Sequence, residues 1–195
     1  MSSKNNPTRA RILDATLQFL EQDGAAAVRM ADIAKRAKIS RQALYLHFPN
    51  RAELLIAAVR HVDEIKKVDA RLAASRQATS GAERLRLWVE AWGGYIPDIY
   101  GVAKALIAIQ DRDAEAKAAW DDRMRAVRAG CSAVVDQLQK DEALNAGLSE
   151  KEATDLLFAL VSVSNWEGLR VVSGWPQERF ISVMTEVSEQ ALLRN

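Results

Sequence analysis

The chain has few cysteines, histidines and prolines, and it has no long uncharged segment. Its single cysteine, Cys131, cannot form a disulfide within the chain, as expected for a protein of the reducing cytoplasm. The longest uncharged stretch of its apolar body, Leu156 to Trp166, has eleven residues, whereas a membrane span needs about 20. The polar start from Met1 to Thr8 does not resemble a secretory signal. We therefore expect a cytoplasmic protein that does not cross a membrane.

Residue patterns that support catalysis or metal binding are also missing. His61 and Glu64 stand one helical turn apart, but no further histidine or cysteine completes a metal site, since His47 belongs to another segment. Cys131 has no histidine to activate it, and a small buried residue is the favoured interpretation. Phosphate-binding glycine loops and nucleophile-elbow sequences are absent. We expect no cofactor, no metal and no enzymatic activity.

Positive charge is concentrated in the first third of the chain. Residues 1–60 contain ten Lys and Arg against five Asp and Glu, whereas residues 61–195 contain 17 against 21. A basic segment in a chain of nearly balanced charge is typical of a part that contacts nucleic acid. A small domain can also differ by a few charges without binding anything.

Residues 29–48 have the pattern of two short helices joined by a tight turn. Ile33 and Ala37 repeat at the spacing of one buried helical face, so a first helix is predicted to end near Ala37. Ser40 can cap a second helix that begins at Arg41, because its hydroxyl can accept a backbone N–H of the first turn. The pattern predicts a helix-turn-helix.

The second helix is predicted to present a surface that suits the DNA major groove. With Leu44 as its buried residue, a rotation of about 100° per residue turns Gln42 and Leu46 away from the core. Ala43 and Tyr45 then lie on the flanks. Glutamine can pair in bidentate fashion with adenine, and alanine or leucine can cover thymine methyl groups. Side chains expected to contact phosphates are Arg41, Tyr45 and His47.

A longer series of residues strengthens this prediction. It comprises Ala31 to Ala37, Ile39-Ser40-Arg41, Leu44-Tyr45, His47-Phe48-Pro49-Asn50-Arg51 and Glu53-Leu54-Leu55. A preceding helix that carries Ile12, Leu13, Ala15 and Phe19 and is closed by Gly24 completes the pattern. This order resembles the DNA-binding segment of the TetR family of bacterial transcriptional regulators. The resemblance covers the first quarter to third of the chain.

The resemblance implies a set of DNA contacts, and three positions depart from the family pattern. The implied contacts are Arg29, Lys38, Ser40, Arg41, Gln42, Ala43, Tyr45, Leu46, His47 and Arg51. Lys38 stands where the family commonly has glycine, so the turn must form without glycine's backbone freedom. Arg29 stands where Thr or Ser usually caps the first helix, which leaves Asp32 to complement the helix dipole. Ala25 replaces a common aromatic residue and removes a packing contact.

The rest of the chain has helical patterns and no strand pattern. Asn50 is expected to cap a long connecting helix, whose apolar stripe is Leu55, Ala58, Val62, Ile65 and Leu72. Capping-box spacing predicts helix starts at Ser80 with Glu83 and at Ser149 with Glu152. The segment Gly93-Gly94 and Pro97 is expected to interrupt the first of these helices. We predict an all-α fold of about nine helices, with a DNA-binding domain at 8–50 and a ligand-binding and dimerisation domain at 51–195.

The last two helices are the predicted dimer interface, because their apolar residues cover more than one face. The residues expected there are Leu156, Leu160, Val163, Phe180, Met184 and Val187. An ordinary intramolecular core is the alternative interpretation. The family resemblance implies a homodimer with two-fold symmetry and therefore an approximately palindromic DNA operator.

Aromatic and methionine side chains of the larger domain are candidates for an effector pocket. They are Trp88, Trp92, Tyr95, Tyr100, Trp120, Met124 and Trp166, and they would suit a small apolar or aromatic ligand. The helix break near Pro97 is the first place where we expect such a pocket. The alternative is that most of these side chains form the hydrophobic core.

These features predict a dimeric, ligand-responsive, DNA-binding regulator that acts as a repressor. Two alternatives stay open: a helical regulator that acts through a protein partner without a small-molecule inducer, and a helical enzyme. Binding to duplex DNA distinguishes the first interpretation from both.

Overall fold

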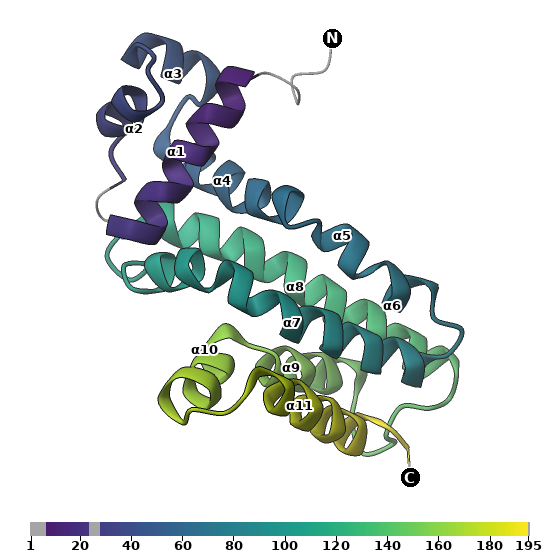
Figure 1. The fold of residues 1–195 in the computed structure, drawn as a ribbon. Helices are drawn as coiled ribbons and strands as arrows, with labels where there is room; N and C mark the ends of the chain where they lie inside the picture. Colours follow the sequence, from purple (N-terminus) through teal and green to yellow (C-terminus); the bar gives the residue numbers. More distant parts are fainter. Residues whose placement is uncertain (1–6, 24–27, 195) are drawn as a thin grey trace. The chain divides into compact units, whose positions relative to one another are not determined.

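The computed structural model describes residues 7–23 and 28–194, and in these residues the chain is all-α, as predicted. The helices are α1 (Pro7–Asp23), α2 (Met30–Arg36), α3 (Arg41–His47), α4 (Arg51–Ile65), α5 (Val68–Arg71), α6 (Ala73–Gln77), α7 (Gly81–Ile107), α8 (Ala114–Lys140), α9 (Glu150–Leu160), α10 (Val163–Trp166), the π-helical η3 (Glu167–Val172) and α11 (Gln177–Leu192) (Figure 1). The predicted helix end at Gly24 and the departure at Ala25 lie outside the described residues.

The chain divides into two compact units. The first comprises residues 1–66 and 99–124, and the second comprises residues 67–98 and 125–195, so that the division crosses both α7 and α8. Helix α4, which the sequence analysis assigned to the second domain, packs against α1 in the first unit. The predicted domain boundary between residues 50 and 51 stays a prediction.

The core of the first unit is built from the apolar faces of α1 to α4. Its fully buried side chains include Ile12, Leu13, Leu20, Ile33, Leu44, Leu54 and Leu55. Burial of each such side chain contributes about 1.5–3 kcal/mol. These helices therefore hold one another in place, and the short α2 and α3 depend on that packing because isolated helices of their length are unstable.

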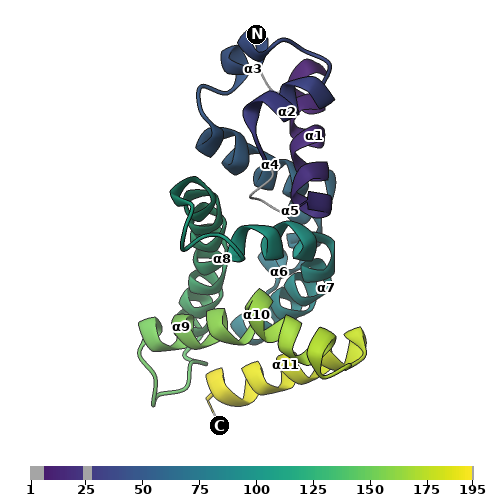
Figure 2. The same cartoon turned by 90° about the vertical axis from the view of Figure 1, so that its left-hand side faces the viewer.

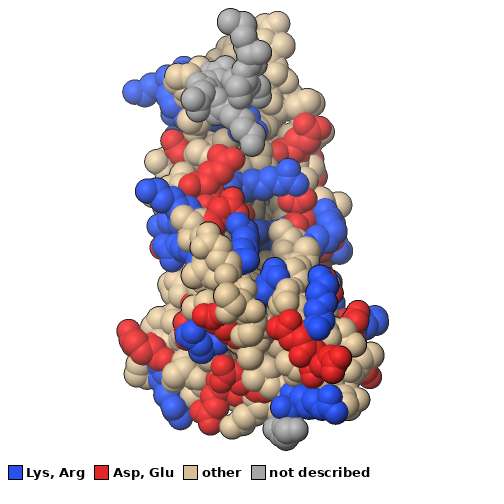
Figure 3. Space-filling view, turned by 90° about the vertical axis from the view of Figure 1, so that its right-hand side faces the viewer, with Lys and Arg blue, Asp and Glu red and all other residues tan. Residues whose placement is uncertain are grey.

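Ion pairs connect α4 to residues 99–124 of the same unit. Arg60 on α4 pairs with Asp122 on α8 at 2.8 Å, and Asp63 pairs with Arg123 at 3.1 Å. The two pairs have opposite orientation: the cation lies on α4 in the first pair and on α8 in the second. Elsewhere on the surface too, side chains of both signs are interspersed, as the face in Figure 3 shows.

The helix expected after Asn50 is present, but the prediction of its length was wrong, because the helix is shorter than expected. Asn50 does cap α4, because its side-chain oxygen accepts the backbone N–H of Glu53 at 2.8 Å. The helix ends at Ile65, however, and Lys67 adopts a left-handed conformation with φ of 54°. The expected apolar stripe is buried as far as Val62, whereas Ile65 at the helix end is half exposed.

Helix α7 is not interrupted by its glycines or by Pro97, contrary to prediction, and runs from Gly81 to Ile107. A proline lacks the N–H that would bond to the carbonyl four residues earlier, here that of Gly93. The side-chain nitrogen of Gln177 donates to this carbonyl at 2.9 Å instead. Gly93 also lets α11 approach, since a Cβ there would lie 3.3 Å from Cγ1 of Ile181. A hydrogen bond from a neighbouring helix therefore makes the proline tolerable.

The second unit packs α9 and α11 side by side, as Figure 2 shows. The predicted capping box at α9 is confirmed, with Ser149 and Glu152 each bonding the other's backbone N–H. The predicted start of α7 is confirmed as well, because the Ser80 hydroxyl accepts the N–H of Glu83 at 3.2 Å. Local capping patterns therefore located helix starts even where the tertiary contacts were not predicted.

Candidate DNA-binding surface

Helices α2 and α3 form the predicted helix-turn-helix. The first ends at Arg36 with Ala37 as its C-cap, and the second begins at Arg41. Ser40 caps α3 as predicted, its Oγ accepting the N–H of Ala43 at 3.0 Å. Leu44 is completely buried and orients α3 against the core.

The turn forms although Lys38 occupies the position of the usual glycine. Lys38 has a φ of 53°, in the left-handed region that disfavours side chains. Its N–H donates to the Lys35 carbonyl at 3.2 Å, and that of Ile39 donates to the Ala34 carbonyl at 3.0 Å. These two bonds make a Schellman motif, which satisfies the last carbonyls of α2. The tight turn therefore forms with a strained backbone at Lys38.

The outward face of α3 has the composition that the sequence predicted. Gln42 is exposed and Leu46 is 82% exposed, a value that is unusual for a leucine on a structured helix. Tyr45 is also exposed, and the Arg41 guanidinium lies 5.6 Å from the centroid of its ring. These side chains are available to base edges and phosphates because none of them packs into the core.

Arg29 is exposed and precedes α2 without capping it. Its backbone is extended, and its side chain makes no capping hydrogen bond to the helix. Asp32 in the first turn is the group that complements the helix dipole, as predicted.

Arg51 does not belong to the exposed surface, which corrects the predicted set of DNA contacts. Its side chain is 15% exposed. Nε donates to the Val28 carbonyl at 2.7 Å, and Nη1 donates to the carboxylates of Asp113 at 2.8 Å and Glu115 at 3.1 Å. With these partners the guanidinium connects distant segments of the first unit and exposes little surface to an external ligand.

Comparison with known proteins agrees with this geometry. The family model for bacterial regulatory proteins of the tetR family matches residues 12–58. The chain is 33% identical over 158 residues to the HTH-type transcriptional activator FasR of Mycolicibacterium smegmatis, a match that covers 80% of this chain and 68% of FasR. It is 28% identical over 188 residues to the HTH-type transcriptional regulator CymR of Pseudomonas putida, covering 94% of this chain and 89% of CymR.

The fold agrees as well. A crystal structure described as a TetR-family transcriptional regulator from Rhodococcus sp. superposes with a TM-score of 0.76 at 20% identity, covering 95% of this chain and 98% of that one. The chain is therefore a helix-turn-helix transcriptional regulator, and it belongs to the tetR family.

The aromatic side chains predicted to line a pocket are divided between the two units. In the second unit Trp88, Trp92, Tyr95 and Trp166 are all buried. Trp92 stacks on Trp88 at 6.1 Å, and its Nε1 donates to the Val161 carbonyl at 2.9 Å. Trp166 Nε1 donates to Gln177 at 3.0 Å. Because the indole N–H groups of Trp92 and Trp166 already have partners inside the unit, these two side chains behave as core.

Trp120 lines a different space, a small apolar cavity within the first unit. The cavity has a volume of about 10 Å³ and lies among α4, α7 and α8; its lining residues are Val59, Val62, Asp63, Ile99, Val102, Ala103, Leu106, Trp120 and Arg123. It has room for about one water molecule. The Asp63–Arg123 ion pair, with side chains 15% and 12% exposed, supplies the charged groups among its described lining residues.

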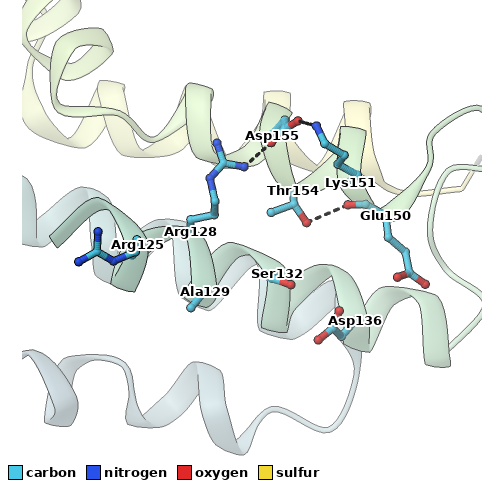
Figure 4. Close-up of a pocket in the computed structure, with 9 residues that line it drawn as sticks. All are labelled: Arg125, Arg128, Ala129, Ser132, Asp136, Glu150, Lys151, Thr154 and Asp155. Atoms are coloured by element: carbon cyan, nitrogen blue, oxygen red, sulfur yellow. Dashed lines mark hydrogen bonds and ion pairs between the residues drawn. The ribbon is translucent and has the colours of Figure 1, made fainter. Parts of the chain in front are cut away.

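A larger groove lies in the second unit between α8 and α9 (Figure 4). It measures about 800 Å³ and is open to solvent. Asp155 pairs across it with Arg128, and Lys151 pairs with the same carboxylate at 2.6 Å. These two hydrogen-bonded cations lower the pKa of Asp155. The groove is polar and contains charges of both signs, unlike the apolar cavity of the first unit.

The residues predicted for a dimer interface differ in exposure. Val163, Phe180 and Met184 are buried within the chain and belong to its own core. The members that stay partly exposed are Leu156, Leu160 and Val187. Val171 and Val172, which the sequence analysis did not include, are exposed at the end of η3.

The described residues contain no cluster of three or more His, Cys, Asp or Glu side chains arranged to hold a metal ion. His61 Nε2 lies 3.1 Å from Asp14 and joins α4 to α1. Burial raises the pKa of Cys131 to about 12, so the thiol stays protonated at neutral pH. None of the helices in the described part of the chain is long and apolar enough to span a membrane.

Proposed function

We propose that the chain is a homodimeric repressor that binds a near-palindromic operator in double-stranded DNA and releases it when a small apolar or aromatic effector binds. The exposed face of α3 carries this proposal, since an 82% exposed Leu46 beside Gln42 suits the methyl groups and edges of A·T pairs. The side chains proposed to contact DNA are Arg29, Lys38, Ser40, Arg41, Gln42, Ala43, Tyr45, Leu46 and His47.

The dimer is proposed to form through α9 and α11. Their partly exposed apolar residues Leu156, Leu160 and Val187 would be covered by the same residues of a second copy. The α3 helices of the two copies, which are the recognition helices, can then enter successive major grooves only if their separation matches the DNA repeat of about 34 Å. The two-fold symmetry requires that the two half-sites be inverted.

The effector is proposed to enter the apolar cavity beside Trp120. Because the cavity is too small for an organic molecule, a ligand there must push α4 away from α7 and α8. Helix α4 packs on α1 and follows α3 directly, so its displacement would change the spacing of the recognition helices. A coupling of about 1–3 kcal/mol is typical for such an effect.

Selection of bound sites from random duplex DNA tests the proposal. The full-length chain should enrich inverted half-sites whose centres are one helical repeat or a multiple apart, and Gln42→Ala should change one base preference within each half-site. Enrichment of single, unpaired sites would exclude the two-fold dimer on DNA. Failure to bind any duplex at low salt would favour a protein partner or an enzymatic role.

The effector site is tested separately, by filling the cavity. Ala103→Leu should block binding of apolar compounds that shift the melting temperature of the wild-type chain. It should also weaken operator binding in their absence, because a side chain larger than the cavity displaces α4 in the same way as a ligand. Ala126→Leu, an exposed change on α8, is the matched control. Compounds that shift both variants and the wild type equally bind elsewhere.

A further inference from the structure

Arg9, in the first turn of α1, lies against the end of the recognition helix. Its guanidinium carbon is 5.0 Å from the centroid of the Phe48 ring, and Phe48 directly follows α3. Because Phe48 is 3% exposed, its ring is a fixed surface. A cation–π contact holds the guanidinium in place through its face and does not itself use the N–H donors.

Among the described residues, no hydrogen-bond acceptor or ion-pair partner is found for Arg9. Arg9 lines a groove of about 440 Å³ together with His47, the last residue of α3. Arg60 lines the same groove, but its guanidinium forms an ion pair with Asp122 at 2.8 Å. Arg51 on the same helix has two carboxylate partners. Unlike these two arginines of α4, Arg9 has no carboxylate partner in the described part of the chain, although the Phe48 ring holds its guanidinium in position.

The acidic residues of this groove are already engaged. Glu53 accepts a hydrogen bond from Asn50 at 3.2 Å, within the cap of α4. Glu64 lies 3.7 Å from the His61 ring. Neither carboxylate forms a recorded ion pair with Arg9 in the described part of the chain, and an anion from outside the chain is the partner that its position favours.

We infer that Arg9 binds a backbone phosphate of DNA beside the bases that α3 contacts, an inference that rests on the DNA-binding function assigned above. A guanidinium matches two phosphate oxygens at once. A phosphate contact at the end of α3 fixes the register of that helix without selecting a base. His47 supplies a second donor in the same groove. The helical pattern of residues 7–23 predicted only packing, because the contact depends on α1 and α3 being brought together.

The test measures binding of a fluorescent random-sequence duplex by full-length variants between about 50 and 200 mM salt. Arg9→Gln should weaken binding about tenfold and lower the slope of log affinity against log salt by about 0.9 for each protomer. Arg9→Lys should keep most of the slope, because it keeps the charge. Lys140→Gln, which removes an exposed charge at the end of α8, should leave both quantities unchanged.

Thermal unfolding of each variant separates binding from packing. If Arg9→Gln lowers the melting temperature and leaves the salt slope unchanged, Arg9 only packs on Phe48 and the inference is overturned. Equal effects of Arg9→Gln and Lys140→Gln would overturn it as well, since net charge would then be responsible. If the wild-type chain does not bind the duplex, the DNA-binding function itself is contradicted. That result differs from an unchanged salt slope, which contradicts only the role of Arg9.

Discussion

Arg51 Nη1 donates hydrogen bonds to both carboxylate oxygens of Asp113, at 3.0 and 2.8 Å. Asp113 also accepts the backbone N–H groups of Glu115 at 3.1 Å and Ala116 at 3.0 Å, and so caps the start of α8. Through its Nε, Arg51 holds the Val28 carbonyl just before α2. One ion pair therefore connects the helix-turn-helix, α4 and α8 inside the first unit.

A double-mutant cycle tests this connection. Arg51→Gln and Asp113→Asn should each lower the free energy of unfolding by about 1–3 kcal/mol, and the double mutant should lose less than the sum. The salt dependence of DNA binding should not change in Arg51→Gln, because the guanidinium does not contact phosphate. Additive losses together with a shallower salt slope would restore Arg51 to the DNA-contact set.

The same carboxylate gives a pH dependence. Partial burial acts to raise the pKa of Asp113, but hydrogen bonds from Ala116 N–H, Arg51 and Glu115 N–H outweigh it and lower the pKa. The stabilisation is therefore complete above the unfolded pKa of about 3.9 and is lost as pH falls through the lower folded value. Urea unfolding should show that Asp113→Asn loses less stability than the wild type between about pH 4 and pH 2. Asp136→Asn, at an exposed site on α8, is the control.

Lys38→Gly should stabilise the chain and weaken its binding to DNA. Glycine removes the left-handed strain at φ of 53°, worth about 1 kcal/mol. It also removes a cation from the DNA-binding surface, so the salt slope should fall by about 1. Lys67→Gly relieves the same strain at φ of 54° outside that surface. It should raise stability equally and leave DNA binding unchanged, as chemical denaturation and fluorescence anisotropy can show.

Gln42→Ala should affect the selected operator and spare random DNA. Loss of a bidentate contact to one base should cost about 1–3 kcal/mol on the operator. Gln139→Ala, an exposed change on α8, should have no effect on either duplex. If Gln42→Ala weakened both duplexes to the same extent, Gln42 would be a phosphate contact.

Gln177 should be more important for stability than its position at the start of α11 suggests. Gln177→Leu removes the donor to the Gly93 carbonyl and the acceptor for Trp166 Nε1, which should cost about 1–3 kcal/mol. Pro97→Ala restores a backbone N–H for Gly93, so Gln177→Leu should cost less in that background. Gln190→Leu serves as the control, because its side chain is exposed and bonds only Glu186 among the described residues. Equal losses in both backgrounds would show that the proline and the glutamine are not linked.

The amino-acid sequence by itself determined the local elements. Ser40 and Ser149 cap helices because their hydroxyls reach N–H groups only three residues away, and the spacing of Ile33 and Ala37 sets one buried face. Leu46 is outward because Leu44 is inward on the same short helix. Such relations depend on a single helical turn, so residue type and spacing are sufficient to predict them.

Tertiary structure decided the role of every side chain whose partner is distant in the chain. Arg51 lies 62 residues from Asp113, and Gln177 lies 84 residues from the Gly93 carbonyl that Pro97 leaves without a donor. Burial of Trp88, Trp92 and Trp166 was likewise fixed by packing between helices. A guanidinium, a proline or an indole has the same local preferences in either role, and only the groups brought against it determine whether it binds a ligand or stabilises the fold.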